Sequence, residues 1–303
     1  MSEVTVSAVI VTYNRLPLLK KAIQKVLNQR TQALKHLIIV NGASSDGTRA
    51  YLDTLSDRRL IVVHLSENVG GAGGFNQGMR QFYEKTSDEF VWVMDDDSMP
   101  SENALGKLLS MFEANPSAGW GASKVTWVDG NFAKMNIPGT MTGHRDRIYS
   151  GTENWVQIKN ATFVSTIFKR ELIKQIGLPQ KEYFIWGDDM EFTQRASQQM
   201  SGYYVQDSIV VHESQFNAKP GDIVGEKLDA RLPRYLYEYR NRILTSRRRH
   251  KRSKMLKTLV HSALDLLRTL LSPGVSYRGR KLLIIIKGTY RGLKFNPQIE
   301  YLS

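Results

Sequence analysis

The N-terminal third of the chain alternates short runs rich in Val and Ile with longer segments compatible with helices, and few folds accept this pattern. The strand-like runs are residues 6–13, 36–41, 60–65 and 90–94, and the helix-compatible segments between them are 17–29, 47–56 and 74–85. Strands that alternate with helices form a parallel sheet that helices cover on both faces. We therefore predict an α/β fold with a mostly parallel sheet flanked by helices.

The second half of the chain is less regular and ends in a strongly basic region. We predict strands at 119–128, 155–168 and 203–212, a helix ending near 176–179, and two further helices at 230–252 and 254–271. A stretch with Pro and Gly at 217–222 predicts a boundary between region 1–225 and region 226–303. Region 226–303 holds 19 Lys and Arg against 5 Asp and Glu, whereas region 1–225 holds 23 against 24. The net charge of +13 therefore belongs to the second region.

Composition excludes several classes of protein. The chain has 303 residues, 41% of them hydrophobic, which suffices for one large core or two smaller ones. It has no Cys, so a disulfide framework, a thiolate zinc site and a cysteine nucleophile are all impossible, and a reducing compartment fits. No run of about 18 apolar residues predicts a membrane span, and we expect the N-terminus not to be a secretion signal.

Polar motifs follow the predicted strands, at the sheet edge where ligands of such folds gather. The first strand runs into Thr12, Asn14 and Arg15, and the second ends in Asn41-Gly42 with Asp46 close behind. A cap at the start of the next helix, by Asp46 or Thr48, would explain that second loop equally well.

Three adjacent carboxylates, Asp95, Asp96 and Asp97, follow the fourth strand. Neighbouring carboxylates repel one another and resist burial unless a positive charge offsets them. In a continuing strand Asp95 and Asp97 would point to one side, where both could bind a divalent metal, and Asp96 would point to the other. A solvated turn is the alternative interpretation.

The glycines of "NVGGAGGFNQG" do not form a dinucleotide fingerprint, because the third glycine of G-x-G-x-x-G would be Asn76. They predict a tight backbone leading into a helix, whose amide groups approach a pyrophosphate or a sugar, or glycines that only permit a bend. Farther along, "WGDDMEF" places Asp188, Asp189 and Glu191 at the start of a helix, where the helix dipole alone would favour acids. Trp186 offers a flat apolar face for a sugar ring or for packing.

The order of these motifs resembles that of inverting family 2 glycosyltransferases, which have the A-type nucleotide-sugar fold with a Rossmann-like sheet. The resemblance covers about residues 5–250 and rests on "VSAVIVTYNR", "NGASSDGT", "WVMDDDSMP" and "WGDDMEF". The motifs "ENVGGAGGFNQGM", the triple Asp, the Trp before "DD" and "YLYEYRNRI" look most like those of galactofuranosyltransferases. Many members carry Asp-Asn where this chain has Asn41-Gly42, and an Asn side chain still offers both a donor and an acceptor to a uracil edge.

The resemblance implies roles for individual residues. Asp189 would be the catalytic base, with Asp188 as the alternate, and Asp95, Asp97 and His212 would bind Mn²⁺ or Mg²⁺. The donor would contact a larger set of residues: Thr12, Asn14, Arg15, Asn41, Asp46, Gly71, Gly74, Asn76, Asp96 and Trp186. The implied reaction moves galactofuranose from UDP-galactofuranose onto a cell-surface or lipid-linked glycan, with a rhamnosyl or other hexosyl donor as the alternative.

The basic region predicts a polyanionic partner. Segment 254–271 has an apolar stripe and a largely basic face, and a short apolar patch lies at 282–286. We expect peripheral attachment at the cytoplasmic face of an anionic membrane. The alternatives are packing of the stripe on the catalytic domain and a homo-oligomer formed through these helices. Nucleic-acid binding by the run 245–254 is the unfavoured interpretation, because no zinc or RNA-binding signature accompanies it.

Overall fold

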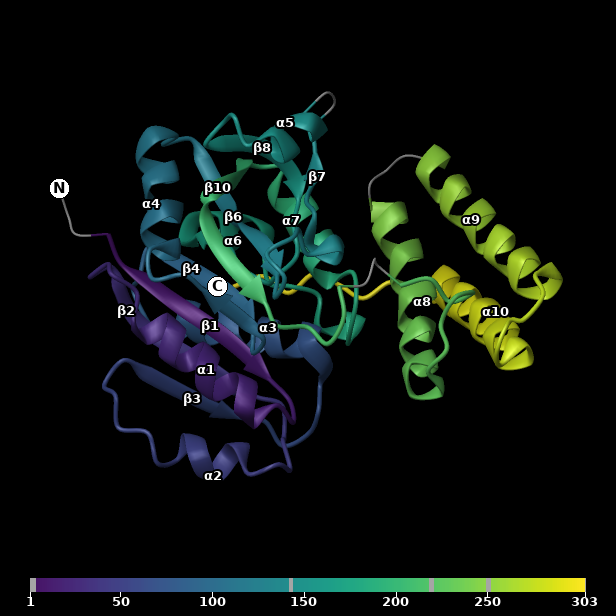
Figure 1. The fold of residues 1–303 in the computed structure, drawn as a ribbon, viewed down its shortest axis with the longest axis horizontal. Coiled ribbons are helices and arrows are strands. Elements are labelled where there is room, and N and C mark those ends of the chain that lie inside the picture. The colour runs from purple at the N-terminus through teal and green to yellow at the C-terminus, as the bar shows by residue number, and fades with distance from the viewer. Residues whose placement is uncertain (1–3, 142–143, 218–220, 249–251, 303) are drawn as a thin grey trace.

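A computed structural model of the chain describes residues 4–141, 144–217, 221–248 and 252–302. Parts of two predicted features, residues 218–220 of the boundary and 249–251 of the basic run, lie outside the described residues. The strands form one sheet in the order β3-β2-β1-β4-β9-β6-β10-β8-β7, and β5 pairs with β10 at one end (Figure 1).

The first part of the sheet is wholly parallel. It contains β1 (Val6–Thr12), β2 (Leu34–Asn41), β3 (Leu60–His64) and β4 (Phe90–Asp95). These strands alternate with α1 (Leu16–Leu27), α2 (Thr48–Leu52) and α3 (Gly70–Lys85). The predicted α/β alternation is confirmed, because Val and Ile suit strands that are buried on both faces.

The second part of the sheet is mixed. Strands β6 (Ala118–Trp127) and β10 (Ser201–His212) are parallel to each other, while β5 (Ser98–Pro100), β7 (Gly139–Thr140), β8 (Trp155–Asn160) and β9 (Thr166–Lys169) pair antiparallel with their neighbours. The single strand predicted at 155–168 is wrong. A buried turn after residue 160 carries the chain from β8, which pairs with β10, to β9, which lies between β4 and β6.

Two apolar layers cover the sheet. Helices α1 and α4 (Ala104–Ala114) pack on one face around Trp92. Helices α3, α6 (Arg170–Ile176) and α7 (Asp188–Ala196) pack on the other, around Phe168. The remaining short helices are α5 (Arg145–Ser150) and three 3-10 turns at Lys134–Asn136, Lys181–Tyr183 and Asp229–Arg231.

Three C-terminal helices lie beside this domain: α8 (Leu232–Arg248), α9 (Arg252–Leu271) and α10 (Arg278–Lys294). Helix α8 faces the sheet domain, and α9 and α10 lie on its far side (Figure 1). The sequence predicts α10 only as the apolar patch 282–286, of which Ile284 and Ile285 pack against α8. Among the described residues, no helix is both long enough and apolar enough to cross a bilayer.

The segment after α10 returns to the sheet domain. Glu300 accepts a backbone hydrogen bond from Leu178 at 2.8 Å, and its side chain pairs with Arg80 of α3 at 2.6 Å. Leu302 is 9% exposed and belongs to the core on the α3 side of the sheet. The sheet domain therefore includes residues from both sides of the helical region.

Candidate active site

The carboxyl ends of β1 and β4 bring four polar side chains together. Thr12 donates a hydrogen bond to Asp96 at 2.7 Å, and Arg15 reaches Asp97 at 2.6 Å and Asp96 at 3.3 Å. The predicted alternation of the three aspartates is wrong beyond Asp95, because β4 ends there and residues 96–97 form the turn into β5. Asp96 and Asp97 consequently share one cation, Arg15.

Strand β10 delivers His212 to the same place. Its pairing with β5 sets His212 opposite Ser98, so the imidazole Nε2 lies 3.2 Å from Asp97 Oδ1. The other ring nitrogen, Nδ1, lies 2.8 Å from the side-chain oxygen of Asn136. When Nε2 carries a proton it donates to Asp97; when only Nδ1 carries one, Nε2 presents a lone pair that a metal ion could bind. Asn136 was not predicted, because nothing in the local sequence around it indicates this contact.

The surroundings shift the pKa values of Asp95, Asp96 and Asp97 in different ways. Burial raises the pKa of Asp95 well above its usual range, and the carboxylates of Asp97 and Asp96 raise it further. Burial raises the pKa of Asp96 to about 6, although Arg15 opposes the shift. The pKa of Asp97 is lowered despite burial, because His212 and Arg15 stabilise its charge. Asp97 is thus the one of the three whose surroundings favour the charged form over the neutral one.

A divalent ion fits part of this arrangement. The buried Oδ1 atom of Asp97 has no hydrogen-bond donor, and it faces the imidazole nitrogen of His212, so the pair presents two lone-pair atoms to one point. Within the described ranges, however, no group of three His, Asp or Glu side chains is already gathered to hold a metal ion. The predicted set of Asp95, Asp97 and His212 is therefore not gathered into one ready-made site, although Asp97 and His212 meet. Arg15 supplies the positive charge instead.

The second acidic pair begins α7. Asp188 is buried, and its carboxylate raises the pKa of Asp95, so the two acidic motifs adjoin. Asp189 is half-buried and accepts a hydrogen bond from the backbone amide of Met190 at 2.6 Å. Burial raises the pKa of Asp189 to about 6, and the charge of Glu238 on α8 acts in the same direction. A carboxylate whose pKa is about 6 can accept a proton near neutral pH.

The segment before α7 is held in an uncommon conformation. Phe184 and Trp186 have φ values of 65°, in the left-handed region that residues other than glycine rarely adopt. The side-chain amide of Asn241 on α8 donates to the carbonyls of Tyr183, Ile185 and Trp186 at 3.0, 3.1 and 2.9 Å. Asn241 lies within the predicted motif "YLYEYRNRI", but its role depends on a contact distant in sequence.

The predicted donor loops after β1 and β2 are bonded to each other. Asn14 accepts a hydrogen bond from the Ser45 amide at 2.7 Å, and Asp46 accepts one from the Leu16 amide at 2.9 Å. Asp46 also accepts from the Thr48 hydroxyl at 2.6 Å, but the N-cap residue of α2 is Gly47, so the alternative of a cap by Asp46 or Thr48 is wrong. Asn41 is 1% exposed, and its amide bonds His64 and the Ser44 backbone. These internal hydrogen bonds already use the side-chain amide of Asn41, the group that the sequence assigns to the uracil ring.

The glycine-rich segment forms the first turns of α3 instead of a loop before it. A Cβ atom on Gly74 would lie 2.3 Å from a methyl group of Val11, so Gly74 permits the helix to pack on β1. A Cβ atom on Gly71 would meet nothing within 4 Å, so Gly71 faces open space. Asn76 is buried and donates to the carbonyl of Pro179 at 2.8 Å. Of these three predicted donor contacts, Gly71 alone presents a free surface.

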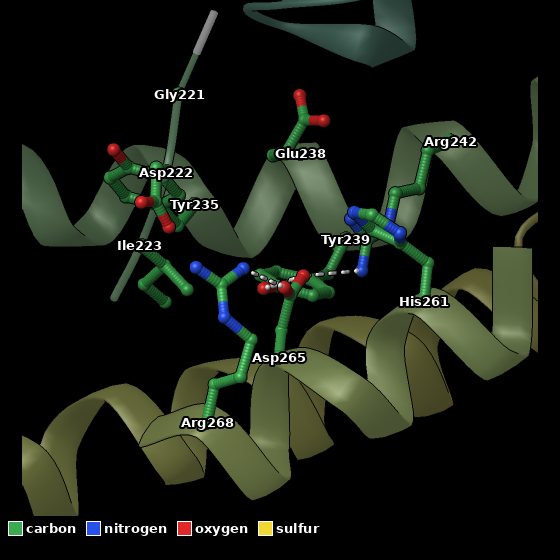
Figure 2. A pocket seen from close by; sticks show the side chains of 10 residues that line it. All are labelled: Gly221, Asp222, Ile223, Tyr235, Glu238, Tyr239, Arg242, His261, Asp265 and Arg268. Carbon is green, nitrogen blue, oxygen red and sulfur yellow. Dashed lines mark hydrogen bonds and ion pairs between the residues drawn. The ribbon is translucent and has the colours of Figure 1, made fainter. Parts of the chain in front are cut away.

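A cavity of about 140 Å³ lies between the segment 221–223, α8 and α9. Figure 2 shows Tyr239 and Arg242 of α8 directed toward Asp265 of α9, while Glu238 points to the opposite side of α8. Tyr235, which also lines the cavity, packs edge-on against Trp186 with ring centroids 5.2 Å apart. The helical region therefore contacts the candidate active site through α8.

Solved structures share this architecture. GalNAc-T7, determined with UDP, GalNAc and Mn²⁺, superposes with a TM-score of 0.60 over 77% of this chain and 48% of that one, at 14% sequence identity. The mannosyltransferase PcManGT from Pyrobaculum calidifontis, determined with GDP-Man and Mn²⁺, gives a TM-score of 0.56 over 95% of this chain and 86% of that one, at 16% identity. The fold is the A-type glycosyltransferase fold.

The sequence pattern of glycosyl transferase family 2 matches residues 7–177, and the chain belongs to that family. Galactofuranosyltransferase GlfT1 of Mycobacterium tuberculosis is 26% identical over 197 residues, which cover 63% of this chain and 64% of that protein. Poly-beta-1,6-N-acetyl-D-glucosamine synthase of Staphylococcus aureus is 29% identical over 108 residues, covering 35% of this chain and 25% of that protein. The chain thus spans less than two thirds of the length of these relatives.

Proposed function

We propose that the protein is a metal-dependent inverting glycosyltransferase that moves galactofuranose from UDP-galactofuranose onto a glycan acceptor. The observation that carries this proposal is the meeting of two acidic motifs at one edge of the sheet. One motif pairs with Arg15 and His212, and the other contains the half-buried acid Asp189. The similarity to a galactofuranosyltransferase supports the choice of sugar.

Different residues act on the acceptor and on the leaving group. Asp189 accepts the proton of the acceptor hydroxyl while that oxygen forms a bond to the anomeric carbon. The bond between the anomeric carbon and the diphosphate oxygen breaks in the same step, and the electron pair leaves with the nucleoside diphosphate. Attack from the side opposite the leaving group inverts the anomeric centre.

The leaving group needs positive charge, and the chain provides a place for it. Arg15 lies over Asp96 and Asp97 and is 48% exposed at its side chain, so it can also meet a phosphate. Mn²⁺ or Mg²⁺ held by Asp97 and His212, with Asp95, would neutralise the diphosphate when bound. Gly71 and Trp186 border the site as contacts for the donor, with Thr12 orienting Asp96.

The acceptor enters from the α8 side in this proposal. Trp186, which is partly exposed and packs on the buried Tyr235, presents an aromatic surface there, and Glu238 lies close enough to Asp189 to raise its pKa. A glycan attached to a lipid would bring the enzyme to the inner face of the cell membrane, as the sequence predicts. A different hexosyl donor is the second candidate, because the N-acetylglucosamine polymer synthase is also a relative.

Thermal unfolding with a set of nucleotide sugars, with and without Mn²⁺, tests the donor and the metal together. A ligand that binds only the folded chain raises Tm, and we expect the largest rise with UDP-galactofuranose and Mn²⁺ together. The variant Asp97→Asn should lose the metal-dependent part of the rise, whereas Asp129→Asn, at an exposed acid outside the proposed ligand set, should keep it. A rise with another nucleotide sugar alone would contradict the galactofuranosyl assignment, and a rise independent of metal would contradict the metal site.

A further inference from the structure

Helix α9 turns its polar side toward the protein and its apolar side outward, which reverses the usual arrangement of a helix in a water-exposed domain. Its inward residues are polar: Ser262, Asp265 and Thr269 are 4%, 7% and 0% exposed. Asp265 accepts a hydrogen bond from the Tyr239 hydroxyl at 2.8 Å, and Ser262 accepts one from Arg242 at 2.8 Å. Figure 2 shows Asp265 of this polar side directed at α8. The helix is thus held in place by buried polar contacts instead of by its apolar stripe.

The apolar stripe of α9 consequently faces outward. Its exposed members recur at helical spacing and are half to three quarters exposed: Leu256, Val260, Leu264, Leu267, Leu270 and Leu271. The sequence-based alternative in which this stripe packs on the catalytic domain is therefore wrong. Outward apolar residues repeat on α10 as Leu283, Ile286, Tyr290 and Leu293, each about half exposed, while Ile284 and Ile285 of the same helix are buried. Large apolar side chains exposed at helical spacing on two helices are uncommon on a surface that meets only water.

The charge around these faces has one sign. Helices α9 and α10 together contain ten Lys and Arg and a single acidic residue, Asp265, which is buried against α8. Lys281 is the buried basic residue of α10, and it donates to the carbonyls of Val224 and Glu226 at 3.0 and 2.7 Å. The exposed positions Lys257, Lys287, Arg291 and Lys294 border the apolar residues. Two such faces brought together would repel each other, whereas an anionic surface would attract both.

We propose that the outward faces of α9 and α10 dock on an anionic lipid surface. Apolar side chains insert among the acyl chains near the headgroups, and the basic residues contact the anionic headgroups. Stable peripheral binding requires two contributions, and here the inserted apolar side chains supply one and the attraction of the basic residues to anionic headgroups supplies the other. This inference uses residues outside the active site and does not depend on which sugar is transferred.

Docking in this orientation has a direct consequence for the site. Helix α8 lies between the docked helices and the sheet domain (Figure 1), its Tyr235 packs on Trp186, and the charge of its Glu238 acts on the candidate base. Packed helices lie roughly 10 Å apart, so the acceptor side of the site would be within two helix layers of the lipid. An acceptor anchored in that surface could then reach the base.

Co-sedimentation of the full-length chain with lipid vesicles tests the proposal. We expect binding to vesicles of phosphatidylcholine with phosphatidylglycerol at low salt, weaker binding at high salt, and little binding to pure phosphatidylcholine. The double variant Leu264→Glu and Leu267→Glu, and separately Lys287→Glu with Arg291→Glu, should each weaken binding about tenfold or more.

Matched controls separate these helices from the rest of the surface. Val128 is 57% exposed on the sheet domain, so Val128→Glu adds the same charge elsewhere. Lys25→Glu with Lys174→Glu reverses two exposed charges on α1 and α6. All variants should unfold at the temperature of the parent chain and the controls should bind vesicles normally. The proposal is overturned if the parent ignores anionic vesicles at low salt, if the helix variants bind like the controls, or if the glutamates instead dissociate a dimer in analytical ultracentrifugation.

Discussion

Asp188 and Asp189 are adjacent in sequence but have different surroundings. Asp188 is buried beside Asp95, where its charge adds to a cluster of carboxylates. Asp189 is half-buried near Glu238 and lies on the side of α8 and the aromatic pair Trp186 and Tyr235. The acceptor hydroxyl must be able to reach the carboxylate that takes its proton, so the geometry favours Asp189 as the base.

The variant Asp189→Asn should bind the donor as the parent chain does and lose turnover by about 10²–10⁴-fold, because it keeps the shape and removes the basicity. Single-turnover rates and donor-induced thermal shifts measure the two effects separately. Should Asp188→Asn be inactive while Asp189→Asn retains turnover, the base is Asp188.

The raised pKa of Asp189 predicts the acid side of the pH profile. The base acts only when unprotonated, so kcat/KM should fall as the pH falls through about 6. Replacing Glu238 by Gln removes a neighbouring negative charge, which should lower the pKa of Asp189 and move this limb to lower pH. Profiles of both proteins decide the point, and identical limbs would show that Glu238 does not act on the base.

At the scale of single elements, the glycines of α3 show how one motif can serve two purposes. Gly74 faces β1 with no room for a side chain, while Gly71 faces open space. The sequence leaves packing and ligand contact as alternatives for the whole run. In the structure, Gly74 serves packing because it lies on the helix face toward β1, and Gly71 is open to ligand contact because it lies on the free face.

Gly74→Ala should lower the free energy of unfolding by about 1–3 kcal/mol, because the added methyl group overlaps Val11. Gly71→Ala is the matched control and should leave stability unchanged or slightly higher, since Ala favours a helix. Chemical denaturation measures both. Equal stability of the two variants would contradict the packing role of Gly74.

Local patterns predict the parts of the molecule that depend on local physics. Val and Ile runs identify the parallel strands, and the polar residues after them identify the edge of the sheet that holds the site. The pattern does not show that β4 stops at Asp95, since Asp96 and Asp97 lie in a turn where they bind Thr12 and Arg15, which are distant in sequence. Asn136 and Asn241 could not be predicted, because each acts on a partner far away in sequence.

The helical region shows the same limit. Amphipathic spacing predicts α9 as a helix but does not say which side faces the protein. That depends on Tyr239 and Arg242 of α8, which bind Asp265 and Ser262. Helix α10 is apolar only over a short patch, and its packing on α8 is a tertiary contact that periodicity does not reveal.

At the scale of the whole molecule, the helical region lies between two parts of the sheet domain along the chain. Leu302 inserts into the core on the α3 side, next to the exposed residue Tyr301. Leu302→Ala should therefore reduce the free energy of unfolding by about 2–5 kcal/mol, as for other buried leucines. Tyr301→Ala, with its side chain 61% exposed, should have little effect. If the two variants unfold alike in denaturant, the returning segment does not stabilise the domain.

This returning segment also determines when the domain can be completed during synthesis. The strands β1 to β10 leave the ribosome before α8, α9 and α10, but Glu300 and Leu302 follow all three helices. The part of the α3 and α6 surface that residues 300–302 cover stays exposed until those residues emerge after the basic helices. Those helices can therefore meet a lipid surface before the enzyme has finished folding.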